Sequence, residues 1–209
     1  MTAPAAALSP SVDALRAAFG PAIRRASVSC GDTIVWVDPA RAHEILAWLK
    51  TTPGQAFNYL TDITAVDYRD PEHPLEVVYQ LRSLDRKADL RIKIALDKTE
   101  PLGVDSVFDV WRGADWLERE VFDMFGVTFR GHPDLRRILM WDTYAEGFPL
   151  RKDFPLRGNF TRAEQTRQVL AANPEANYSL EELTIADVFD ELPEDMKRRL
   201  AQGERGELR

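Results

Sequence analysis

The sequence contains few residues that bind metals. Among its 209 residues Cys30 is the single cysteine, and the histidines are His43, His73 and His132. Iron–sulfur clusters usually take four thiolates, and a structural zinc takes four Cys or His ligands. We therefore expect a chain that holds neither kind of centre by itself and forms no internal disulfide. That count is compatible with a reducing compartment such as the cytoplasm.

Long apolar runs and a broad excess of basic residues are also missing. No stretch of about 18 apolar residues occurs, and the first twelve residues lack the pattern of a signal peptide. The net charge is −7, and only residues 130–162 are locally basic, with seven basic and four acidic side chains. We expect no membrane span, no export signal and no nucleic-acid partner, because phosphate-driven binding needs a broad basic face. The basic segment would suit an acidic protein surface instead.

What is present predicts one folded domain of the α+β class. The composition is 44% hydrophobic and 29% charged, which is typical of a packed soluble protein. Alternating apolar residues predict strands in 75–84 and 89–96, joined by a short hairpin connection. We expect a small mixed or antiparallel sheet with packed helices on one side. The other expected elements are helices at 11–19 and after Asp38-Pro39, a hairpin around Cys30-Gly31, and a strand within 57–68.

A longer helix is predicted over 106–126. Its expected start is a Ser106 cap, Gly113 is a possible break, and Gly126 fits the left-handed position after the last turn. Residues 11–138 would thus form the core domain, 139–160 an extended segment that binds a partner, and 161–209 a partly helical tail. Helical character is clearest in 178–202.

The charged residues of this helix allow several interpretations. Glu118, Glu120, Asp123 and His132 could form an acid–base set or a metal site, but a helical wheel does not bring the carboxylates together. Arg119, Glu120 and Asp123 could instead form a solvated helix face. Glu118 falls within the apolar arc, where a buried carboxylate requires a partner. We predict that it pairs with Arg136 or Arg137.

The segment that follows is rich in rings and prolines. Residues 140–160 read MWDTYAEGFPLRKDFPLRGNF, and Pro149 and Pro155 disfavour a helix or a central strand. A solvated loop is the ordinary interpretation of such a stretch. Its aromatic and arginine content is closer to that of a binding hot spot, so we expect it to dock in a partner and to become ordered on assembly. Phe148 and Phe154 would be the anchors, and Arg151 and Lys152 would set the orientation.

Two motifs resemble a known family. The pattern E-R-E-x-x-D-M-F-G-V-x-F-x-G-H-P-D-L-R-R-I-L occupies 118–139, and G-F-P-L-R-K-D-F-P-L occupies 147–156. Both resemble the 30-kilodalton subunit family of NADH-quinone oxidoreductase, respiratory complex I. A weaker similarity extends back to about residue 33. The tail differs, because the family commonly continues with an extended run rich in aromatics and arginine.

The resemblance implies a core subunit of the hydrophilic arm on the cytoplasmic side of the bacterial inner membrane. Such a subunit would carry no cofactor, while FMN and iron–sulfur clusters would belong to its partners, chiefly cluster-bearing subunits and the subunit that lines the quinone cavity. It would touch the membrane only indirectly. The resemblance gives the first motif a structural role and the second an interface role, on these residues: Glu118, Arg119, Glu120, Asp123, Gly126, His132, Pro133, Asp134, Arg136, Arg137, Phe148, Pro149, Leu150, Arg151, Lys152, Asp153, Phe154 and Pro155. A related ion-pumping hydrogenase, another quinone dehydrogenase and a free-standing carboxylate–histidine enzyme are the alternatives.

Overall fold

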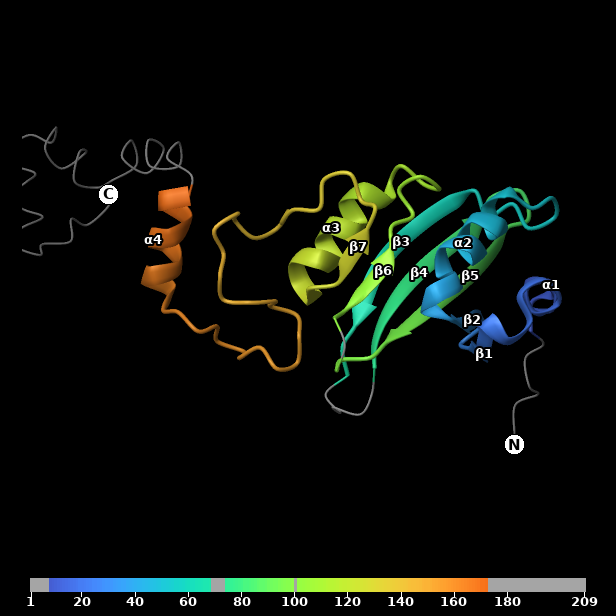
Figure 1. Cartoon of the computed structure of the whole chain (residues 1–209), viewed down its shortest axis with the longest axis horizontal. Helices are drawn as coiled ribbons and strands as arrows, with labels where there is room; N and C mark the ends of the chain where they lie inside the picture. The colour runs from blue at the N-terminus through green and yellow to red at the C-terminus, as the bar shows by residue number, and fades with distance from the viewer. Residues whose placement is uncertain (1–7, 69–73, 100, 173–209) are drawn as a thin grey trace, which may run out of the picture. The chain divides into compact units, whose positions relative to one another are not determined.

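A computed structural model describes residues 8–68, 74–99 and 101–172 (Figure 1). The chain divides into two compact units, Met1–Asn159 and Phe160–Arg209. The second unit is described through α4 (Arg162–Ala172), which lies in the tail that was expected to be partly helical. The helix expected at 178–202 lies outside the described residues.

A five-stranded mixed sheet forms the centre of the first unit. Its strands are β1 (Ile23–Ser29), β2 (Asp32–Val37), β3 (Tyr59–Val66), β4 (Leu75–Ser83) and β5 (Ala88–Leu96), in the order β1-β2-β5-β4-β3. Within this sheet only β2 and β5 pair in parallel, and α2, β3 and β4 lie between them in the chain. The α+β class, with a mixed sheet and packed helices, is confirmed.

Local chemistry explains the ends of these elements. Cys30 and Gly31 both have positive φ, 52° and 92°, as a two-residue turn between twisted strands requires. Asp38 accepts a hydrogen bond from the amide of Ala40 and starts the turn η2 (Pro39–Arg41), which leads into α2 (Ala42–Thr51). Helix α1 (Pro10–Phe19) ends at Gly20, which also has positive φ. The short turn η1 (Gly20–Ala22) connects it to β1.

One face of the sheet is covered and the other is open. Leu90, Ile92 and Ile94 of β5 are buried in the same core as α1, α2 and α3 (Ala114–Phe125), whereas Arg91 and Lys93 point to the opposite face. Figure 1 shows α2 across the sheet and α3 beside β3. The alternation of apolar and polar residues in β5 thus reflects a sheet with one covered face.

The predicted helix over 106–126 is correct only in its second half. Residues 103–105 form β6 (Gly103–Asp105), which pairs in parallel with β7 (Thr128–Arg130), and the chain then makes turns until α3 begins after Gly113. Ser106 does not cap α3. Its hydroxyl accepts from the amide of Phe108, while the amide of Val107 donates to Glu118. The local capping pattern is real, but it closes a turn rather than a helix.

Candidate functional site

The candidate site is built on α3 and on the chain that follows β7. We call residues 131–138 the strap and residues 139–159 the arm. Gly126 ends α3 with φ 77° and ψ 23°, the left-handed conformation predicted from the sequence. The chain then passes through β7 and returns along α3. Neither the strap nor the arm contains a helix or a strand, as predicted for residues 140–158.

Asp123 is the centre of the contacts between α3 and the strap. Its side chain is fully buried, and its Oδ2 accepts the amides of Ile138, Leu139 and Met140 at 3.1, 2.8 and 2.8 Å. Its Oδ1 lies 2.6 Å from NH1 of Arg137. Burial raises the pKa of Asp123, but these hydrogen bonds outweigh it and hold the pKa below its usual value. The prediction of a solvated position for Asp123 is wrong, because the strap covers that side of the helix.

Arg119, one helical turn before Asp123, also binds the strap. It is nearly buried, and its guanidinium donates to the carbonyl oxygens of Arg136 and Arg137 at 3.1 and 2.9 Å. Its predicted place on a solvated face is therefore also wrong. Of the three residues assigned to that face, only Glu120 is exposed.

Glu118 is buried as predicted, but its predicted arginine partner is wrong. Its carboxylate accepts from the Ser106 hydroxyl at 2.6 Å and from the Val107 amide at 2.7 Å, so it holds the turn before α3. Burial raises its pKa, and the two hydrogen bonds oppose that rise only in part. The prediction failed because it looked for a partner in the motif that follows Gly126. The two donors lie instead in the turn that precedes α3.

His132 lies next to Glu118. The imidazole is fully buried, its Nδ1 accepts the amide of Asp134, and its Nε2 lies 3.2 Å from the carbonyl oxygen of Asp115. Nε2 is 3.9 Å from the Glu118 carboxylate. The structure thus brings together two members of the acid–base set, but Glu120 and Asp123 lie elsewhere. No group of three His, Cys, Asp or Glu side chains in the described residues could hold a metal ion.

The start of the arm packs on its own domain. The guanidinium of Arg137 lies 5.1 Å from the ring centre of Tyr144 and 5.5 Å from that of Phe148, and it donates to the carbonyl of Gly147. The Phe148 ring also lies directly over Gly126. Phe148, which the sequence predicted as an anchor in a partner, is thus in contact with this chain.

Two further hydrogen bonds fix the middle of the arm. The amide of Leu150 donates to the carbonyl of Met124, and the amide of Lys152 donates to Oδ2 of Asp67 at 2.8 Å. Asp67 also pairs with Lys98 at 2.7 Å. Nothing in the sequence pointed to Asp67, since no local pattern connects it with a residue 85 positions away.

The other predicted residues of the two motifs lie at the surface or in local turns. Asp134 and Arg136 form an exposed ion pair at 2.8 Å, and Pro133 is exposed. Arg151 pairs with Asp153 at 3.4 Å, and Phe154 is half-buried next to Gly147. Pro149 is half-buried, whereas Pro155 is exposed. Leu156 is fully exposed and Leu150 is half-exposed.

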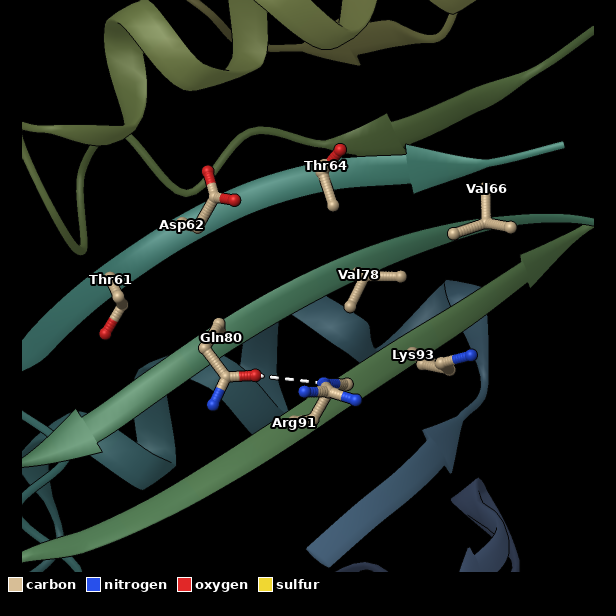
Figure 2. Close-up of a pocket in the computed structure, with 8 residues that line it drawn as sticks. All are labelled: Thr61, Asp62, Thr64, Val66, Val78, Gln80, Arg91 and Lys93. Atoms are coloured by element: carbon tan, nitrogen blue, oxygen red, sulfur yellow. Dashed lines mark hydrogen bonds between the residues drawn. The ribbon is translucent and has the colours of Figure 1, made fainter. Parts of the chain in front are cut away.

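The open face of the sheet carries a separate groove of about 440 Å³ (Figure 2). Side chains from β3, β4 and β5 line it, and Figure 2 shows Gln80 bonded to Arg91 on its floor. Arg91 also pairs with Asp32, and Lys93 pairs with the buried Glu76, which accepts from Trp36 as well. Both cations of the groove, Arg91 and Lys93, are therefore already paired with carboxylates of this chain.

Together these features describe an α+β domain whose arm is held against α3 by buried polar contacts. Residues 35–160 match the family model described as respiratory-chain NADH dehydrogenase, 30 Kd subunit. The chain belongs to this family. No helix in the described ranges is long and apolar enough to cross a membrane.

Individual relatives agree with that assignment. A subunit of NADH-quinone oxidoreductase from Rhizobium etli is 49% identical over 141 residues, which are 67% of this chain and 73% of that protein. The mitochondrial 30.4 kDa subunit of NADH-ubiquinone oxidoreductase from Neurospora crassa is 41% identical over 136 residues, 65% of this chain and 47% of its own length. A chain from the membrane-bound sulfane sulfur reductase, an archaeal respiratory membrane complex, has the same fold. The TM-score is 0.57 at 24% identity, over 70% of this chain and 84% of that one.

Proposed function

We propose that this chain is a cofactor-free subunit of the peripheral arm of a proton-translocating NADH-quinone oxidoreductase. In this proposal it supports assembly, and neighbouring subunits carry electrons from NADH through FMN and iron–sulfur clusters to quinone. It sits on the cytoplasmic side of the inner membrane and touches the lipid only through its partners. The names of relatives that are 41–49% identical support the choice of this complex over a hydrogenase or another dehydrogenase.

The observation that carries the proposal is the way the arm is held. Arg137, Asp123 and Asp67 fix the arm to the domain as far as Lys152. The side chains of Leu150, within this held part, and of Leu156, beyond it, are exposed. A segment without regular structure that holds apolar side chains in water has the features of an interface. Preorganisation lowers the entropic cost of binding, so a stapled arm is a better docking element than a free one. We propose the quinone-cavity subunit as its main partner and the cluster-bearing subunits as further neighbours.

Leu150→Asp combined with Leu156→Asp tests this proposal in the native host. Both positions are exposed, so the purified chain should melt like the wild type. The tagged variant should fail to co-purify with the other subunits, and membranes should lose NADH-dependent quinone reduction. Leu84→Asp is the matched control, because Leu84 is 56% exposed in the β4–β5 hairpin. Normal assembly of the arm variant would show that the arm is a surface loop and that the interface lies elsewhere.

A further inference from the structure

A tryptophan on the outer side of α3 stands out among the exposed side chains. Trp116 is 63% exposed, and Leu139 at the start of the arm is 61% exposed. Single apolar residues at a surface are ordinary. Trp116, however, lies on α3, the helix that holds the arm, and Leu139 is the first residue of the arm. On a wheel of 100° per residue, Trp116 falls between Asp123 and Glu120.

Trp116 is supported by a side chain that is itself fixed. The guanidinium carbon of Arg119 lies 5.7 Å from the centre of the Trp116 ring system. The two carbonyl oxygens of the strap hold this guanidinium in place. The indole is thus restrained before any partner arrives, while most of its surface remains in water. A restrained, exposed tryptophan next to arginine is the composition found at the centres of protein interfaces.

Trp116 lies on nearly the same side of α3 as Asp123, which binds the start of the arm. Asp123, seven residues later, is about 10 Å further along the helix axis, and its carboxylate accepts the amide of Leu139. Leu139 is the first residue of the arm, so one partner surface can span both places. Glu120 lies one helical turn after Trp116 and is exposed, which adds a negative charge beside the indole.

We propose that Trp116, Glu120 and Leu139 form a second docking surface for the same neighbouring protein that binds the arm. The complementary surface is an apolar pocket bordered by a lysine or arginine, which pairs with Glu120. This inference rests on the proposed function. Two linked contacts bind far more tightly than either alone, because the second forms at a high effective concentration. The arm and the α3 surface would act together in this way.

The test compares tagged full-length variants in the native host and measures the recovery of partner subunits from solubilised membranes. Trp116→Ala and Glu120→Lys should each lower that recovery by about tenfold, and Glu120→Asp should restore most of it. Leu84→Ala and Asp85→Lys are the matched controls, because both residues are exposed in the β4–β5 hairpin. They should leave recovery unchanged. The melting temperature of each purified chain shows whether the fold is intact.

The outcomes separate this inference from the proposed function. Normal recovery with Trp116→Ala and Glu120→Lys, together with loss in the Leu150/Leu156 variant, would overturn the second surface and leave the arm proposal standing. Normal recovery in the arm variant would instead contradict the proposed function. If Trp116→Ala melts early, the Glu120 pair decides the question. Low recovery of partner subunits with Glu120→Lys and near-normal recovery with Glu120→Asp would support the second surface. Equal recovery with the two variants would overturn it.

Discussion

Arg137 and Asp123 form the buried ion pair that joins α3 to the arm, with 2.6 Å between NH1 and Oδ1. The same guanidinium donates to the carbonyls of Asp123 and Gly147. The carboxylate also takes three successive strap and arm amides. Since one pair connects the end of the helix, the strap and the start of the arm, the orientation of the arm depends on it.

Asp123→Ala should destabilise the fold by about 3–5 kcal/mol, because it leaves a half-buried arginine and three amides without their acceptor. Urea denaturation of the purified chain measures this change. Asp134→Ala is the control: its pair with Arg136 is exposed, and such pairs contribute about 0–1 kcal/mol. Asp123→Ala and Arg137→Ala together should cost clearly less than the sum of the two single changes. Strict additivity would show that the pair does not hold the strap.

The same carboxylate predicts a loss of stability in acid. The pKa of Asp123 is lowered in the folded state from an ordinary value of 3.8, so its contribution is complete above that value. It is lost as the pH falls through the folded pKa, because the unfolded chain then binds more protons. Asp123→Asn should therefore show a flatter decline of unfolding free energy below about pH 4 than the wild type. If the unfolding free energy of both proteins declines equally steeply below this pH, Asp123 is not the source of the acid sensitivity.

The sequence predicted the sheet better than it predicted the charged helix. Alternation in β5 and the turn at Cys30-Gly31 depend on local rules, and both agree with the structure. The wheel for α3 assumed that polar means solvated. It failed at Arg119 and Asp123 because the strap returns over them, and a wheel contains no information about chain that lies outside the helix. Short parallel pairs such as β6 and β7 left no pattern, since three residues cannot display alternation.

Glu118 allows a sharper test than its predicted arginine pair did. Glu118→Gln keeps one acceptor for the Val107 amide, and the Ser106 hydroxyl can accept from the new amide group. It should cost about 1 kcal/mol or less, whereas Glu118→Ala strands both donors and should cost about 2–4 kcal/mol. Thermal denaturation compares the two. Equal losses would show that the negative charge, rather than the hydrogen bonds, is what the site requires.

Glu118 also predicts a pH dependence opposite to that of Asp123. Its pKa is raised in the folded state above the ordinary 4.5, so the folded chain retains the proton longer. Its contribution is greatest below 4.5 and declines as the pH rises through the folded pKa. Glu118→Gln should remove this decline, which denaturation at a series of pH values from about 4 to 8 would detect. An unchanged slope in the variant would mean that Glu118 titrates alike in both states.

Gly126 should be required for the position of the arm as well as for the end of α3. A Cβ at this position would lie 2.5 Å from the Phe148 ring, and φ is 77°, so Gly126→Ala combines backbone strain with a clash. Gly131 has a similar φ of 81° and open space around it, so Gly131→Ala carries the strain alone, at about 1–2 kcal/mol. Gly126→Ala should cost more than Gly131→Ala in urea denaturation. It should also speed tryptic cleavage after Arg151 and Lys152, because Phe148 is displaced and the arm loosens.

In a Phe148→Ala background the clash is absent, and the two alanine substitutions should then cost the same within about 0.5 kcal/mol. If they already match in the wild-type background and cleavage does not change, Phe148 does not hold the arm against the helix.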